Sequence, residues 1–263
     1  MPKPVIVFSA DEHFGSNTAL MPKEFVNDDK QLITASPIQL WLLENWNTAW
    51  REVWNYCKRR TVIVVFVGDL VEGNHDKSVQ GMTNMADQEN MAYEMIEPIV
   101  HKANRTYILR GTARHTGEAA ESESRIASRL GVPCLWEITS EWGNKIFNIS
   151  HHGKAGGLPW TGGMSSIVAS CLIDAVKLNE PSPNYIVRAH AHVVDDTGEK
   201  FPNCRGFTLP AWQLRTGFGY KVASHRVSDI GLAWIDLEKA DQGHGITIRR
   251  FYAPRHFIRE YND

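Results

Sequence analysis

Aspartate and histidine side chains follow short apolar runs at five separate places along the sequence. These residues are Asp11 and His13, Asp69, His115, His151 and His152, and His190 and His192. Two carboxylates with several imidazoles and no thiolate suit Mn²⁺, Fe, Zn²⁺ or Ni²⁺, whereas Ca²⁺ requires more oxygen ligands. Six or seven ligands are too many for one ion that keeps an open position. The sequence therefore predicts two divalent transition-metal ions about 3.5 to 4 Å apart, Mn²⁺ being favoured, which an aspartate such as Asp69 can bridge with its two oxygens.

The apolar runs that precede these side chains have the length and composition of β-strands. They span residues 4–10, 61–67, 105–110, 145–150 and 184–189, and two later candidates span 231–237 and 245–251. Helical patterns cover about 86–103, 120–130 and 165–178, and the last is apolar nearly all round, which predicts a buried helix. This alternation predicts α/β layering, and the strand-rich final third predicts a mixed sheet. Active sites in such sheets gather at the carboxyl ends of the strands, where these side chains stand.

A further helix is predicted between the first two strands. Ser36 is its N-cap, Pro37 occupies the first helical position and Gln39 closes a capping box. Tryptophans recur at every fourth residue of this helix: Trp46, Trp50 and Trp54. A tryptophan face at helical spacing is typical of a core contact, so we expect these rings to pack inside the protein rather than to stack on bases.

The composition limits the class of protein. A chain of 263 residues with 43% hydrophobic content can bury one large core, which predicts a single domain over residues 1–263. The near balance of 28 basic and 30 acidic residues excludes the global basic field of a nucleic-acid coat protein or a membrane-surface binder. Four scattered cysteines indicate reduced thiols, and no apolar run reaches the length of a membrane span. We expect a soluble, cytoplasmic protein with no membrane partner.

The ordered set of motifs resembles the calcineurin-like metallophosphoesterases. That family carries D-x-H, then G-D, then G-N-H-[DE], then H, then G-H-x-H, and the matching motifs here run from Asp11 to His192. The resemblance implies a four-layer α/β/β/α sandwich with mixed sheets and a dinuclear metal site. It also implies an assignment of ligands: Asp11, His13 and His192 to the first ion, Asp69 to both, and His190 with His151 or His152 to the second. We favour His151 over His152, because the first histidine binds in relatives with this strand ending.

The third motif of the family is the one from which this sequence departs. The run 105–110 is followed by Gly-Thr-Ala-Arg-His at 111–115, without the family's metal-binding asparagine. A Gly-Asn-His-Asp does occur at 73–76, but it lies only four residues beyond Asp69, ahead of the helix that should intervene. We interpret it as a chance match, while the alternative that Asn74 or His75 folds back over the metals stays open. Asn74, Thr112 and His115 are the candidates for replacing the missing ligand.

His115 is our choice for the third motif, and two roles are open to it: general acid for the leaving oxygen, or replacement ligand of the second ion. Arg110 and Arg114 beside it are candidates for holding phosphate oxygens. Asn74 and Lys154 are candidates for contacting the substrate.

These features predict metal-dependent hydrolysis of a phosphodiester, with a DNA or RNA nuclease as the favoured specific form. Segments 205–221 and 248–259 interleave aromatic side chains with arginines, a composition that suits single-stranded nucleic acid but also partly buried strands. The alternatives are a phosphomonoesterase or protein phosphatase, and a non-catalytic scaffold that keeps the same fold for binding other proteins.

Overall fold

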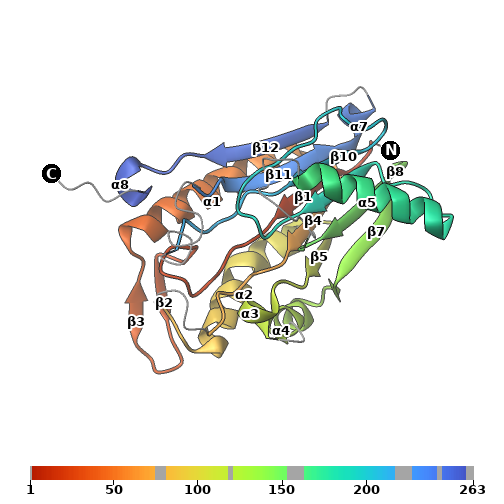
Figure 1. Cartoon of the computed structure of the whole chain (residues 1–263). Helices are drawn as coiled ribbons and strands as arrows, with labels where there is room; N and C mark the ends of the chain where they lie inside the picture. Colours follow the sequence, from red (N-terminus) through yellow and green to blue (C-terminus); the bar gives the residue numbers. More distant parts are fainter. Residues whose placement is uncertain are drawn as a thin grey trace.

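Two mixed β-sheets form the centre of the computed structural model, which describes residues 2–74, 81–117, 121–152, 163–216, 227–241 and 245–258 (Figure 1). The larger sheet has the order β12 (Ile246–Phe251), β11 (Ile230–Asp236), β1 (Val5–Ser9), β4 (Val62–Val67), β5 (Arg105–Leu109) and β6 (Cys134–Leu135). β1, β4, β5 and β6 run parallel, and β11 is antiparallel to both of its neighbours. The smaller sheet has the order β10 (Arg205–Thr208), β9 (Tyr185–Arg188), β8 (Lys145–Ser150) and β7 (Glu137–Trp142). Because β7 is antiparallel to β8 while β8, β9 and β10 run parallel, both sheets are mixed, as predicted.

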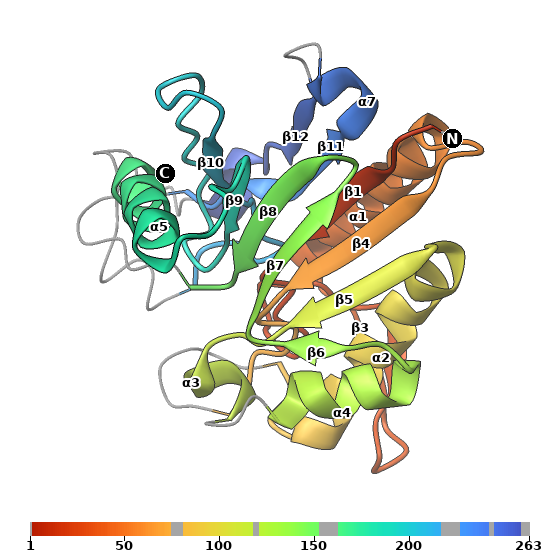
Figure 2. The same ribbon diagram turned by 90° about the vertical axis from the view of Figure 1, so that its right-hand side faces the viewer.

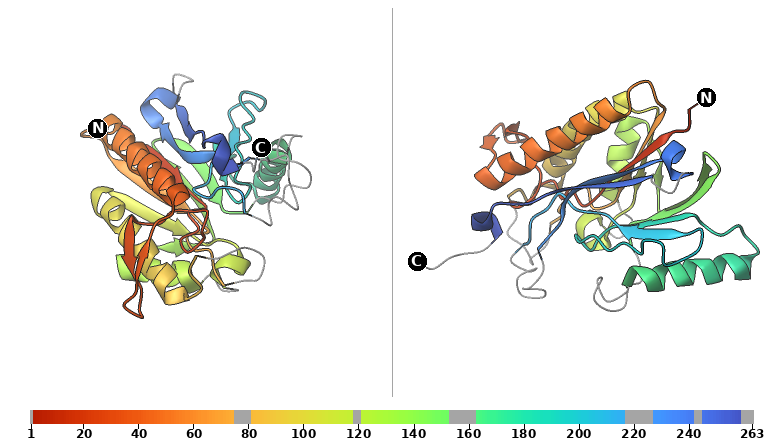
Figure 3. Two further views of the ribbon diagram at one scale, coloured as in Figure 1. Left: turned by 90° about the vertical axis from the view of Figure 1, so that its left-hand side faces the viewer. Right: turned by 90° about the horizontal axis from the view of Figure 1, so that it is seen from above.

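Helices cover the outer face of each sheet. The larger sheet carries α1 (Pro37–Tyr56), α2 (Met85–Lys102) and α4 (Glu121–Leu130), and the smaller sheet carries α5 (Gly163–Leu178). Short helices α3 (Ala113–Thr116), α7 (Leu237–Ala240) and α8 (Arg255–Ile258) and a hairpin of β2 (Glu24–Val26) and β3 (Leu32–Thr34) complete the described elements. Seen from above, α1 and α5 lie on opposite sides of the sheets (Figure 3).

Alternation of side chains along the buried strands creates the layers. In β4, Val64 and Phe66 pack against the α1 and α2 side, whereas Ile63 and Val65 pack in the core between the two sheets. A strand that is apolar at every position is therefore buried on both faces, which is the reason for its continuous apolar run. A third, smaller cluster joins α5 to the smaller sheet. The predicted four-layer α/β/β/α sandwich is confirmed.

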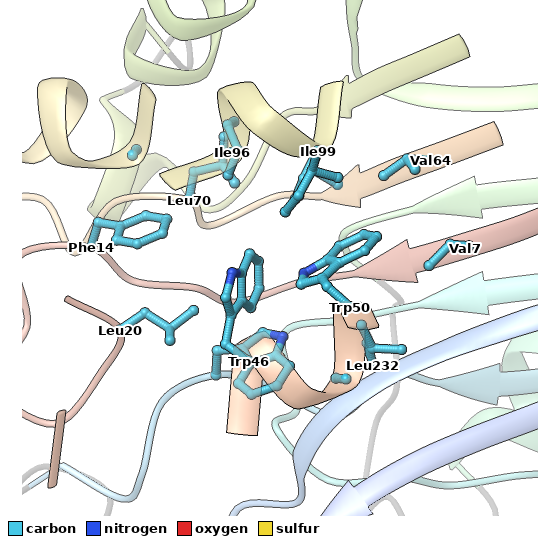
Figure 4. Close-up of a cluster of buried hydrophobic side chains, with 14 of the residues drawn as sticks. Val7, Phe14, Leu20, Trp46, Trp50, Val64, Leu70, Ile96, Ile99 and Leu232 are labelled. Atoms are coloured by element: carbon cyan, nitrogen blue, oxygen red, sulfur yellow. The ribbon is translucent and has the colours of Figure 1, made fainter. Parts of the chain in front are cut away.

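The tryptophan face of α1 is part of the core, as predicted. Trp46 and Trp50 are only 3% and 4% exposed, and the ring of Trp46 lies 5.0 Å from that of Trp212. Figure 4 shows both rings among the side chains of Leu20, Leu70 and Ile99. The predicted capping box at the start of α1 is also present, with reciprocal hydrogen bonds between Ser36 and Gln39.

The sequence prediction missed the short helices α3, α7 and α8 and several strands, and it misjudged the burial of one helix. The strands β2, β3, β6, β7 and β10 were not predicted, because they are short or alternate polar with apolar residues and so lack a long apolar run. The prediction of a buried helix at 165–178 was wrong for one of its faces. In α5, Ile173 and Val176 are 54% and 76% exposed, because this helix forms an outer layer with a sheet on one side only. Among the helices described, none is long and apolar enough to span a bilayer.

Candidate metal centre

The parallel strands of the two sheets end on the same side of the molecule. Figure 2 shows the arrowheads of β4, β5 and β8 pointing toward one edge, where the connecting loops gather. The predicted ligands follow these ends: Asp11 and His13 after β1, Asp69 after β4, His115 after β5, His151 after β8, and His190 and His192 after β9. Their side chains form overlapping groups whose ligand atoms lie within 4.8 Å of one another. The fold thus brings together residues up to 181 positions apart in the sequence.

The backbone at this edge adopts a conformation that residues other than glycine rarely take. Five of the predicted ligands have positive φ angles: Asp11 (55°), His13 (48°), Asp69 (54°), His190 (68°) and His192 (55°). Such residues cost free energy and concentrate at functional sites, where the surrounding structure holds them. Two of the supports are backbone hydrogen bonds between the exits of β1 and β4, from Asp11 N to Gly68 O and from His13 N to Asp69 O. The turns direct the side chains into one shared space.

Asp11, His13 and His192 form the first cluster. His192 Nε2 lies 3.2 Å from His13 Nε2 and 3.3 Å from Asp11 Oδ1. The other carboxylate oxygen of Asp11 accepts a hydrogen bond from the backbone N–H of His190 at 3.1 Å. Oδ1 is buried and accepts no well-aligned hydrogen bond within the described part of the chain. A buried carboxylate oxygen without a donor, beside two imidazole nitrogens, fits a cation.

Asp69 lies between this cluster and a second one. Its Oδ2 is 3.0 Å from His151 Nε2, 3.9 Å from His190 Nδ1 and 4.0 Å from His115 Nε2. Asp69 also shares ligand groups with Asp11 and with His13. A side chain in reach of both clusters is suited to bridge two ions.

Three of the histidines are held with Nε2 directed at the clusters. His151 Nδ1 is 2.6 Å from the carbonyl oxygen of Val67, and His115 Nδ1 is 2.7 Å from that of Glu72. His13 Nδ1 lies 3.1 Å from the carboxylate of Glu72, which also accepts from Gln213 Nε2 at 2.7 Å. A carbonyl or carboxylate beside Nδ1 keeps the proton there and leaves the lone pair of Nε2 free to bind a metal.

In the absence of a cation, the carboxylates of the site raise the pKa values of two of its histidines. Burial disfavours charge on His151, but the carboxylates of Asp69 and Asp11 outweigh it and raise the pKa of His151 to about 10. For His13, burial is likewise outweighed by the contact with Glu72 and by neighbouring carboxylates, so its pKa rises to about 9. Despite burial, the pKa of Asp69 is held well below its usual range by His151. Cation binding would release the histidine protons, as is usual for metal sites.

His115 behaves differently from these two histidines. Burial and the nearby His13 lower the pKa of His115 to about 4. Its ring lies edge-on to that of His13, with 4.6 Å between the centroids. At neutral pH the imidazole is therefore neutral, which suits a ligand better than a proton donor.

The remaining predicted residues lie around the clusters or outside the described chain. His152 is exposed and its ring is 4.8 Å from that of His151 and 4.9 Å from that of His190. The Arg110 guanidinium lies over the ring of Trp136 at 4.9 Å, whereas Arg114 is exposed on α3. Asn74 is exposed in the loop that follows β4, so Gly-Asn-His-Asp stands before α2. His75 and Lys154 lie outside the described residues.

Glu72 is a part of the site that the sequence did not predict, whereas Thr112 was one of three candidates for replacing the missing ligand. Glu72 is buried, in contact with His13, and stands three residues after Asp69. Thr112 donates its backbone N–H to Asp69 Oδ1 at 2.5 Å and its hydroxyl to Asp69 Oδ2 at 2.9 Å. This approach needs Gly111, where a Cβ would lie 2.2 Å from Asp69 Oδ1. A glycine before Thr112 was the available signal, because it permits a close backbone contact.

The described parts of the two aromatic and arginine-rich segments are mostly internal or ion-paired. Phe207 and Trp212 are fully buried. Arg205 makes two hydrogen bonds to Asp196, and Arg249 makes two to Glu52. These four side chains are engaged in the fold, whereas Tyr252 of the second segment is 79% exposed.

No family model matches the chain, and no curated protein matches it. A structural neighbour is a novel archaeal phosphodiesterase, at 14% identity and a TM-score of 0.46, covering 94% of this chain and 99% of the other. Vacuolar protein sorting 29 of Cryptosporidium parvum matches at 10% identity and a TM-score of 0.46, over 89% of this chain and 86% of its own. The Entamoeba histolytica protein of that name, in complex with Zn²⁺, matches at 11% identity and a TM-score of 0.46. The match covers 94% of this chain and 98% of the other.

This chain's own strand order and ligand positions carry the comparison of its fold with the sequence motifs. Each element of the D-x-H, G-D, H and H-x-H series follows the end of a buried strand, and the side chains converge on one edge. This arrangement agrees with the resemblance to the calcineurin-like metallophosphoesterases that the order of the sequence motifs carries.

Proposed function

We propose that the protein is a metal-dependent phosphoesterase that hydrolyses phosphodiesters at a centre of two ions. The observation that carries this proposal is the buried carboxylate of Asp69, which lies between two groups of imidazoles with their Nε2 or Nδ1 atoms turned inward. Asp11, His13 and His192 would hold the first ion, and His151 and His190 the second, with Asp69 shared. Bound cations in such a centre acidify a water nucleophile and neutralise the charge that develops on the phosphoryl oxygens.

The residues around the centre orient the ligand side chains and keep them buried from water. Val67 and Glu72 hold the rings of His151, His115 and His13 in position, so the ligands need little rearrangement. Asp11, His13, Asp69 and His151 are all buried, which strengthens their electrostatic interactions with bound charge. We infer that His115 acts as an additional ligand on the His13 side, since its neutral form presents Nε2 toward Asp69.

The preference for a diester rests on the open side of the centre. His190, His152 and Arg114 are exposed, whereas the ligands of the first cluster are largely buried. A phosphate with two esterified groups could lie across such a mouth, with Arg114 near one of its oxygens. Nucleic acid is one such substrate. Arg205 and Arg249 do not add to the argument for it, because both are engaged in ion pairs.

A substrate panel tests this proposal. Bis-p-nitrophenyl phosphate, p-nitrophenyl phosphate, cyclic nucleotides, a phosphopeptide, and single- and double-stranded DNA and RNA are each assayed with Mn²⁺ and with EDTA. We expect diester turnover that EDTA abolishes and that Asp69→Asn lowers to the EDTA background. The control Asp174→Asn makes the same chemical change on an exposed part of α5 and should leave turnover intact.

Two outcomes would overturn the proposal. Turnover of monoester or phosphopeptide well above that of every diester would assign the centre to a phosphomonoesterase. Two bound ions without turnover of any ester would instead favour the binding scaffold.

A further inference from the structure

The hydroxyl group of Thr112 lies inside the second cluster. Its Oγ1 is 2.9 Å from Asp69 Oδ2, 3.3 Å from His151 Nε2 and 3.1 Å from His190 Nδ1. Thr112 follows β5, the position at which the family motif would carry its metal-binding asparagine. The side chain that replaces the asparagine therefore reaches the same group of ligand atoms.

The spacing of these atoms is that of ligands around one ion. Donor atoms about 2.1 Å from a cation lie about 3.0 Å apart as octahedral neighbours and about 3.4 Å apart as tetrahedral ones. The three contacts of Thr112 Oγ1 and the 3.0 Å contact between His151 and Asp69 fall in or next to this range. The fifth contact, between His190 and Asp69, is longer at 3.9 Å.

The local structure directs the hydroxyl to the cluster instead of to the adjacent helix. Thr112 is the N-cap of α3, a position where a threonine hydroxyl usually accepts a hydrogen bond from the helix. Here the side chain makes no capping hydrogen bond. The close contact of Gly111 with Asp69 fixes the backbone so that Oγ1 points at His151 and His190. Because its proton is donated to Asp69, the hydroxyl oxygen keeps lone pairs for another partner.

We propose that Thr112 is a ligand of the second ion and that this substitution makes the second site the weaker of the two. The inference rests on the proposed two-ion centre. In the first cluster Asp11 Oδ1 lies 3.3 Å from His192 Nε2, whereas it is 4.0 Å from His151 Nε2 of the second cluster. Asp69, at 3.0 Å from His151, is the nearer carboxylate there. A neutral hydroxyl is a ligand that threonine also provides to Mg²⁺ in nucleotide-binding loops. Affinity for a cation falls as the number of charged ligands decreases, so the second ion binds only when its free concentration is higher.

Titration of the metal-free protein with Mn²⁺ tests this inference. Calorimetry gives the number and affinity of the ions, and electron paramagnetic resonance distinguishes single Mn²⁺ ions from coupled pairs. We expect wild type to bind two ions with unequal affinity. Thr112→Val, which removes only the hydroxyl, should leave the first affinity unchanged and weaken the second about tenfold or more, with loss of the coupled signal.

Two further variants separate a ligand role from a folding defect. Thr112→Ser keeps the hydroxyl and should bind the second ion like wild type. Thr106→Val makes the same threonine-to-valine change within β5, at a buried side chain outside the site, and should retain both ions. Circular dichroism confirms that each variant is folded.

The possible results have distinct meanings. A Thr112→Val protein that binds both ions as wild type does, or that loses affinity for both equally, would overturn the inference, the latter result assigning Thr112 to the positioning of Asp69 alone. A wild-type protein that binds fewer than two ions would overturn both this inference and the two-ion centre. If Thr112→Val loses only the second ion and wild type hydrolyses none of the esters, the proposed activity is refuted but the role of Thr112 as a ligand is supported.

Discussion

Glu12 is a buried acid beside the proposed metal centre, and its charge state should affect the stability of the fold. It stands between Asp11 and His13, is fully buried, and its Oε1 accepts a hydrogen bond from Ser9 Oγ at 2.5 Å. Burial raises the pKa of Glu12 to about 8 from an ordinary value of 4.5. The other oxygen, Oε2, has no hydrogen-bond partner among the described residues, so nothing there favours the ionised form. We therefore expect a neutral carboxylic acid in the metal-free protein at neutral pH.

Glu12→Gln should stabilise the metal-free protein in a way that depends on pH. The unfolded chain releases the Glu12 proton above pH 4.5, whereas the folded protein keeps it until about pH 8. The contribution of this acid to stability is thus complete below pH 4.5 and is lost progressively as the pH rises to 8. At about 1.4 kcal/mol per pH unit, the interval from 4.5 to about 8 corresponds to a loss of about 5 kcal/mol. A neutral glutamine of the same shape avoids this loss.

Urea unfolding in EDTA at pH 4.5, 6, 7 and 8 measures the difference between variant and wild type. We expect the two proteins to have similar free energies of unfolding near pH 4.5. Above that pH the variant should become steadily more stable than wild type, by up to about 5 kcal/mol at pH 8. Subtraction removes the contributions of the site histidines, which are common to both. Glu141→Gln, an exposed change on β7, is the control and should show no such trend. A gap between Glu12→Gln and wild type that does not change with pH would refute the assignment of a buried, protonated Glu12.

Three other changes test the site and the core. Glu72→Gln removes the charge beside His13 Nδ1 and should weaken the first ion about 10- to 100-fold in calorimetry, whereas unchanged affinity would contradict the positioning role. Gly111→Ala would place a Cβ 2.2 Å from Asp69 Oδ1, so metal analysis of the purified protein should show lost ions, and full occupancy would contradict the close contact. Trp46→Ala should cost about 3 to 5 kcal/mol of unfolding free energy in urea, because the ring is core. The largely exposed Trp136, changed in the same way, should cost far less.

The parts of the fold that the sequence predicted are those in which local pattern and burial agree. β1 and β4 are apolar at nearly every position because both faces are covered, and α1 carries its own start signal and a continuous tryptophan face. β7 alternates polar with apolar residues, and β10 (Arg-Gly-Phe-Thr) has one large apolar residue, so neither differs enough from a loop to be predicted. The exposed end of α5 could not be read from its apolar composition, since exposure depends on how much of a helix the neighbouring sheet covers.

The types and order of the candidate ligands were determined by the sequence alone. Parallel strands end at a common edge, so Asp and His residues after successive strands can be expected to meet. The tertiary structure decided which atoms face one another and in which protonation state. Thr112 joins the second cluster only because β5 lies beside β4, and Glu72 meets His13 and Gln213 across long stretches of chain. The reason is physical: a residue type sets which chemistry is available, while charge and ligation depend on burial and on neighbours that only the folded chain supplies.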